Sequence, residues 1–160
     1  MPSAIVVPVV EPSVRGLCCK AYPLHPKGCP NFNKKQGCPP QALLIGELLD
    51  PSAPVWAVWN VFDFAVHVAK MREAHPDWSE RQLACCLYWQ PKARAALRNE
   101  IRVFLDSHSG LGVVACPEAC GVNMTATMQG IGVALEWPPV TKALQIVLAG
   151  SRRPTQGKGG

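Results

Sequence analysis

Runs of apolar residues separated by proline-rich breaks divide the chain into short predicted elements. The predicted strands share apolar residues with strong β propensity, and they are residues 55–62, 113–115, 132–136 and 143–149. Residues 55–62 (VWAVWNVF) are nearly all apolar, which is typical of a strand buried on both faces. Residues 1–15 predict an irregular or edge-strand lead-in.

Helical patterns fill the spaces between these strands. The predicted helices are residues 41–49, 64–75, 80–89 and 92–108, and a further helical turn is predicted at 123–129. Asp63 is placed to cap the second of them, which stops before Pro76. Ser79 and Gln82 form a capping box for the third, and Pro91 precedes the fourth. The fourth helix places five apolar residues mostly on one face: Ala95, Leu97, Ile101, Phe104 and Leu105.

This order of elements predicts an α/β or α+β fold in a single domain over residues 1–150. We expect a small mixed sheet, three or four helices and a long loop rich in Cys and Pro. A chain of 160 residues, 48% of them hydrophobic, is long enough to bury a core without crosslinks. Residues 151–160 are polar and Gly-rich and predict a disordered tail.

The loop over residues 16–41 contains the most informative pattern in the chain. Three cysteines are followed directly by proline, at Cys29-Pro30, Cys38-Pro39 and Cys116-Pro117. Proline fixes its own φ and pushes the preceding residue out of helical geometry, so each pair holds a thiol on a stiff, extended backbone. Iron–sulfur ligand runs end in the same Cys-Pro pair. A long irregular loop inside a compact domain is usually functional, and a bound metal would keep it ordered.

The candidate metal ligands are six of the eight cysteines: Cys18, Cys19, Cys29, Cys38, Cys116 and Cys120. Neighbouring side chains diverge, so we expect one ligand from the pair Cys18-Cys19. Cys85 and Cys86 lie in a predicted helix, where a free cysteine often fills a core. A [4Fe–4S] cluster needs four thiolates, or three with one open iron. The chain has no CxxC knuckle, which argues against a zinc ribbon but leaves a zinc site from scattered residues open, with His25 as a possible mixed ligand.

The net charge of +5 is mild and gives no long basic face, so we do not expect nucleic-acid binding. Lys34 and Lys35 lie between two candidate ligands, where they could offset thiolate charge or attract an anion. No apolar run reaches membrane-spanning length, and no secretory signal is predicted. We therefore expect a cytoplasmic protein with reduced thiols. The alternative is a secreted protein in which the eight cysteines form four disulfides.

The segment GCPNFNKKQGCPP resembles the motif of a family of predicted metal-binding, iron–sulfur proteins of unknown function. That family carries a GCPNYGK-type segment, eight residues between the two cysteines and a CPP ending. The matching positions are Gly28, Cys29, Pro30, Asn31, Phe32, Lys34, Cys38, Pro39 and Pro40. Asn33 stands where the family usually has glycine, and asparagine can adopt the same left-handed geometry.

A second stretch, CPEACGVNMTATMQGIGV, looks like a variant of a C-terminal segment of that family. The matching positions are Cys116, Pro117, Glu118, Thr127, Met128, Gly130 and Ile131. Two features depart from the pattern. Cys18 and Cys19 lie ten or more residues before the GCPN motif, and Cys85-Cys86 stands where the family has a cysteine cluster. Over about a third of the chain, the resemblance implies iron–sulfur binding at the first site and gives no support for a second.

Three functions follow from these patterns. The first is an electron-transfer protein with a cluster and a redox protein partner. The second is an enzyme whose cluster binds a small-molecule substrate at an open iron, with Lys34, Lys35 and Glu118 as candidates for cofactor-binding, anion-binding or acid–base roles. The third is a structural zinc module that binds a partner protein. The patterns do not identify a reaction.

Overall fold

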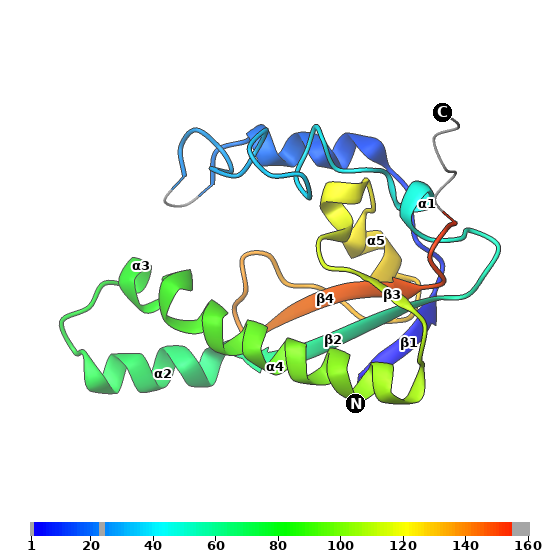
Figure 1. Ribbon diagram of the computed structural model, residues 1–160. Coiled ribbons are helices and arrows are strands. Elements are labelled where there is room, and N and C mark those ends of the chain that lie inside the picture. Colours follow the sequence, from blue (N-terminus) through cyan, green and yellow to red (C-terminus); the bar gives the residue numbers. More distant parts are fainter. Residues whose placement is uncertain (1, 23–24, 155–160) are drawn as a thin grey trace.

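A four-stranded antiparallel sheet forms the centre of the protein. The computed structural model describes residues 2–22 and 25–154. The strands are β1 (Ser3–Val6), β2 (Val55–Asp63), β3 (Gly112–Val114) and β4 (Lys142–Gly150), in the order β1-β2-β4-β3. β2 and β4 pair over nine residues each and form the middle of the sheet (Figure 1). The single domain with mixed α and β elements is confirmed, and the sheet differs from the mixed one expected because all its pairings are antiparallel.

The predicted strand at residues 132–136 is wrong. This segment is irregular, and its start is fixed by the Val133 N–H, which donates to the Met128 carbonyl at 3.0 Å. Ile131, Val133 and Leu135 are half-buried against the core, whereas the residues between them are exposed. The alternation that predicted a strand therefore comes from a loop lying flat on the core.

The helices are α1 (Ile45–Leu48), α2 (Phe64–Ala74), α3 (Glu80–Leu83), α4 (Cys86–Ser107) and α5 (Met124–Gln129). Two predicted N-caps are confirmed, since the Asp63 carboxylate accepts the Val66 N–H at 3.0 Å and Ser79 and Gln82 form their capping box. The predicted helix at 41–49 is a single turn, and residues 41–44 precede it.

The predicted boundary at Pro91 is wrong. The helix predicted at 80–89 breaks after Leu83, and α4 then runs through Pro91 without interruption. Pro91 removes one N–H that would bond to the Leu87 carbonyl. Packing offsets this loss, because Trp89 and Ala93 on either side are buried against Phe64.

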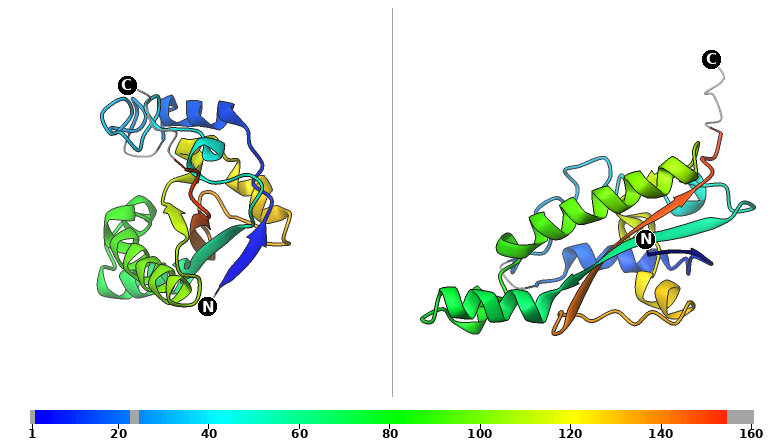
Figure 2. Two further views of the ribbon diagram at one scale, coloured as in Figure 1. Left: turned by 45° about the vertical axis from the view of Figure 1, so that its right-hand side comes forward. Right: turned by 90° about the horizontal axis from the view of Figure 1, so that it is seen from below.

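Two layers cover the sheet, and Figure 2 shows them on opposite sides. On one face, α4 packs Leu97 and Phe104 against Val58 and Val147. Ala95, predicted on this face, is exposed, and Ala93 is fully buried in its place. On the other face, the second core cluster includes residues from α1, α5 and the segment after β3: Ile45, Leu49, Cys120, Val122, Met124 and Met128.

Two short 3-10 helices lie above this second layer. They are η1 (Pro12–Cys19) and η2 (Pro117–Cys120), and the long loop from residue 20 to 44 follows η1 (Figure 1). The predicted tail begins with ordered residues, because the Ser151 carbonyl accepts the Asp50 N–H at 2.8 Å and the Arg153 backbone N–H donates to the Leu48 carbonyl at 3.0 Å. Residues 155–160 of that tail lie outside the described residues.

Candidate metal centre

Cys18 and Cys29 are held side by side by the backbone. Cys18 lies near the end of η1, and the Cys29 N–H donates to its carbonyl oxygen at 2.7 Å. Gly28 makes this approach possible, since its φ is +84° and a Cβ there would lie 2.6 Å from that same oxygen. Only glycine fits both conditions without displacing the backbone.

A compact turn places Cys38 next to this pair. Asn33 has φ 56°, so the left-handed geometry expected at this position is confirmed. Its N–H donates to the Pro39 carbonyl at 2.8 Å, and the Gln41 amide donates to its side-chain oxygen at 2.8 Å. These bonds close the turn around Cys38, and its own N–H donates to the Lys35 carbonyl at 3.0 Å.

Arg15 joins the loop to η1. Its guanidinium donates to the carbonyls of Pro40 at 2.9 Å and Ala42 at 2.8 Å, across more than twenty residues of sequence. The cationic donor makes both bonds stronger than neutral ones. The loop that contains Cys29 and Cys38 is therefore held against the helix that contains Cys18.

Cys116 reaches the same region from the end of β3. It is the N-cap residue of η2, and its neighbour Pro117 is fully buried. Gly121 ends η2 with φ 82°, and its carbonyl accepts the Glu11 N–H at 2.7 Å. This bond attaches η2 to the segment that leads into η1, so Cys116 lies beside the loop.

Electrostatic coupling shows which thiols come together. Burial raises the pKa of Cys18, and the charges of Cys29 and Cys38 raise it further. Burial also raises the pKa of Cys116, and Glu118, Cys38, Cys120 and Cys18 add to it. Thiolates affect one another in this way only at short range. The structure thus gathers four predicted ligands from separate segments, Cys18, Cys29, Cys38 and Cys116, and all of them are free thiols.

The other predicted ligands lie differently. Cys19 is exposed at the end of η1, and Cys120 is only 5% exposed and packs in the core with Val122 and Met124. Burial raises the pKa of Cys120, and the Arg15 charge opposes this. Cys86 is half-buried against the cluster that contains Phe64 and Trp89, as expected for a core cysteine.

Three predicted polar residues lie around the thiols. Lys34 and Lys35 are exposed on the turn between Cys29 and Cys38. Burial raises the pKa of the Glu118 carboxyl, and a backbone hydrogen bond partly offsets this. Because Glu118 acts on both Cys18 and Cys116, it lies at the edge of the thiol group rather than apart from it.

Sequence reasoning missed Arg15 and Tyr22. Burial raises the pKa of Tyr22, and Cys29 and Cys86 add to the shift, so its phenol lies beside the thiols. The Tyr22 ring packs on His25 with centroids 4.7 Å apart. Neither residue belongs to a ligand pattern in the sequence.

The donor set fits a thiolate-bound centre. Among residues 2–22 and 25–154, no three His, Cys, Asp or Glu side chains form a group that could hold a single metal ion. Zn–S bonds of about 2.3 Å put the four sulfurs of a tetrahedral site only about 3.8 Å apart. A [4Fe–4S] cluster bonds each thiolate to a different iron and so accepts sulfurs that are farther apart. The four free thiols supply the donor type that either centre uses.

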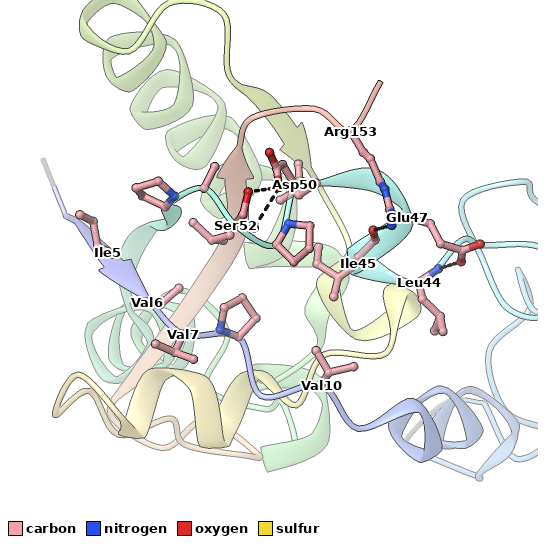
Figure 3. Close-up of a pocket in the computed structure, with 17 residues that line it drawn as sticks. Ile5, Val6, Val7, Val10, Leu44, Ile45, Glu47, Asp50, Ser52 and Arg153 are labelled. Carbon is pink, nitrogen blue, oxygen red and sulfur yellow. Dashed lines mark hydrogen bonds between the residues drawn. The ribbon is translucent and has the colours of Figure 1, made fainter. Parts of the chain in front are cut away.

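A large open pocket lies away from the cysteines. It has a volume of about 750 Å³ between β1, α1 and the turn before β2 (Figure 3). Its walls are mostly apolar, and its polar groups bond locally: Glu47 accepts the Leu44 N–H at 2.8 Å, and Asp50 accepts the Ser52 hydroxyl at 2.7 Å. These interactions leave no cluster of free reactive groups in the part of the cavity that the structure describes.

No protein-family model, curated protein or solved structure matches this chain. The resemblance at GCPNFNKKQGCPP therefore stays a prediction. Within the described residues, the structure contains no helix with both the length and the apolar character needed to cross a bilayer.

Proposed function

We propose that this protein binds an iron–sulfur cluster through Cys18, Cys29, Cys38 and Cys116. One observation carries the proposal: besides burial, the charges of Cys29 and Cys38 raise the pKa of Cys18, and those of Cys38 and Cys18 raise the pKa of Cys116. Thiolates that repel one another are stabilised by a cationic centre, because it favours their deprotonated forms. The backbone around them is built for close approach at Gly28 and for a tight turn at Asn33.

The cluster would give the protein an electron-transfer function. A cluster with four cysteine ligands exchanges single electrons at a potential set by burial and nearby hydrogen bonds. Cys18, Cys29 and Cys38 are half-buried rather than enclosed, so a redox partner could approach the site closely. Tyr22 would sit beside Cys29, where its phenol can donate to the thiolate. A site with three ligands and an open iron, which would bind a small-molecule substrate, is the related alternative.

Anaerobic reconstitution with iron and sulfide tests the proposal. We expect about four irons and about four sulfides per chain and a broad visible absorption band. Cys29→Ser and Cys38→Ser should each remove most of the bound iron. Cys85→Ser is the matched control, because Cys85 is not among the groups that act on Cys18 or Cys116, and it should retain the iron.

Two outcomes would contradict the cluster. Colourless protein with one tightly bound zinc would identify the structural zinc module instead. Full iron content in both Cys29→Ser and Cys38→Ser would show that other residues bind the metal. Loss of iron in Cys85→Ser as well would show a general effect on folding, and circular dichroism of each variant detects this.

A further inference from the structure

A second cavity opens on one side of the thiol group. It has a volume of about 500 Å³ and is lined by Cys18 and Cys29, while neither Cys38 nor Cys116 lines it. This volume falls within the range of small-molecule sites, about 300–1,000 Å³. A ligand in this cavity would therefore lie beside the proposed cluster without occupying its place.

Apart from the thiols, the charged side chains that line this cavity are cationic. Lys27 and Lys34 line it together with His25, and none of the described lining residues is acidic. The ion pairs among the described residues, Arg72–Glu80 and Arg102–Asp106, lie in and beside α2–α4 and do not involve either lysine. Both ammonium groups thus remain available for a ligand of opposite charge.

The wall beside the lysines is apolar. Phe32 is half-buried and lines the cavity with Pro26 and Pro30. Rigid apolar walls with a few polar groups are typical of sites that bind organic molecules. The two cations select for charge, and this wall selects for an apolar body.

We propose that this cavity binds a small organic anion, with its carboxylate or phosphate on Lys27 and Lys34 and its apolar part against Phe32. The inference rests on the proposed cluster, because the anion would be the ligand or substrate held next to that redox centre. The cation pair raises the local concentration of anions at the thiol group. Lys35 lies on the same turn but does not line the cavity.

Calorimetric titration of the iron-loaded protein with benzoate tests the site. Benzyl alcohol serves as the neutral analogue, and inorganic phosphate serves as an anion that lacks an apolar part. We expect benzoate to bind more tightly than either. Lys27→Gln and Lys34→Gln should each weaken benzoate about fivefold, the value of one solvent-accessible ion pair. Lys35→Gln makes the same change in net charge and should leave the affinity within about twofold.

Each result below overturns either the anion site alone or the proposed function together with it. Equal weakening by Lys35→Gln and Lys34→Gln would show a general charge effect and overturn the site. Equal binding of benzyl alcohol or of phosphate, or no binding of benzoate, would also overturn it. If the protein contains a cluster but binds no benzoate, the anion site fails and the proposed function stands. If the protein binds no iron, the proposed function fails, and this inference fails with it.

Discussion

Gly28→Ala is the most direct test of how the backbone assembles the thiol group. Gly28 has φ +84°, and an alanine Cβ would lie 2.6 Å from the Cys18 carbonyl oxygen and 2.9 Å from the Cys19 carbonyl carbon. Holding a residue with a side chain in left-handed geometry costs about 1–2 kcal/mol. Relief of the clash must separate Cys18 from Cys29 and weaken their 2.7 Å hydrogen bond, which costs about 1 kcal/mol more.

We therefore expect Gly28→Ala to lower the free energy of unfolding by about 2–3 kcal/mol. Urea unfolding measures this, and the five tryptophans provide a fluorescence signal. The displaced Cys18 and Cys29 should also lower the iron content after reconstitution. Both effects have one cause, the Cβ at position 28.

Gly37→Ala is the matched control in the same loop. A Cβ at Gly37 would meet no atom within 4 Å, and its backbone is not left-handed. We expect its free energy of unfolding to change by less than about 0.5 kcal/mol, with full iron content. Equal stability and equal iron content in the two variants would refute the argument that Gly28 fixes the approach of Cys18 and Cys29.

Three further predictions concern the core, a loop and the thiols. Phe104 is fully buried against the sheet, so Phe104→Ala should lower the free energy of unfolding in urea by about 3–5 kcal/mol. Val103→Ala, on the exposed side of the same helix, should change it by less than about 0.5 kcal/mol, and similar values for both variants would contradict the packing. Hydrogen bonds from the Thr141 side chain and from the backbone at 140–142 lower the pKa of Glu136 to about 2, so the carboxylate stabilises the fold above its ordinary pKa of 4.5 and loses this effect as pH falls towards 2. Glu136→Gln should remove this part of the acid dependence of Tm, and an unchanged dependence would contradict the loop geometry. Burial raises the pKa of Cys116, so in the metal-free protein at about pH 8 its thiol should react with iodoacetamide more slowly than the same thiol in the urea-unfolded chain. Peptide mass spectrometry of the Cys116 peptide measures both rates, and equal rates would contradict the shift.

Local signals predicted most of the elements because each one depends on neighbouring residues. β2 follows from a run of Val and Trp, β4 follows from an apolar run around Ile146 and Val147, and α2 begins at its predicted cap, Asp63. The errors arise where a tertiary contact overrides a local rule. Pro91 stays inside α4 because Trp89 and Ala93 are buried on the sheet side, and this packing is not visible in the sequence around the proline.

The choice among the cysteines shows the same division between local and long-range causes. The Cys-Pro pairs and the positive φ of Asn33 are local features, so the turn around Cys38 was predictable. Whether Cys116 or Cys120 faces the loop depends on η2, where Gly121 and the buried Pro117 turn Cys120 into the core and leave Cys116 beside Cys38. The Cys116-Pro117 pair already favours Cys116 as a ligand, but the sequence leaves Cys120 as a second candidate, and the packing of η2 separates the two.

The Arg15 clamp explains how a loop of this length is held in place. A loop of more than twenty residues without regular structure loses much conformational entropy when it is ordered. Arg15 opposes this loss at the far end of the loop by bonding Pro40 and Ala42, while the Cys18–Cys29 backbone bond acts at the near end. Between these two points, short hydrogen-bonded turns order the chain, including the one that Asn33 closes with Pro39. Arg15 and the Cys18–Cys29 bond thus hold the loop at both ends, which lowers the ordering entropy that binding of the proposed cluster would have to offset.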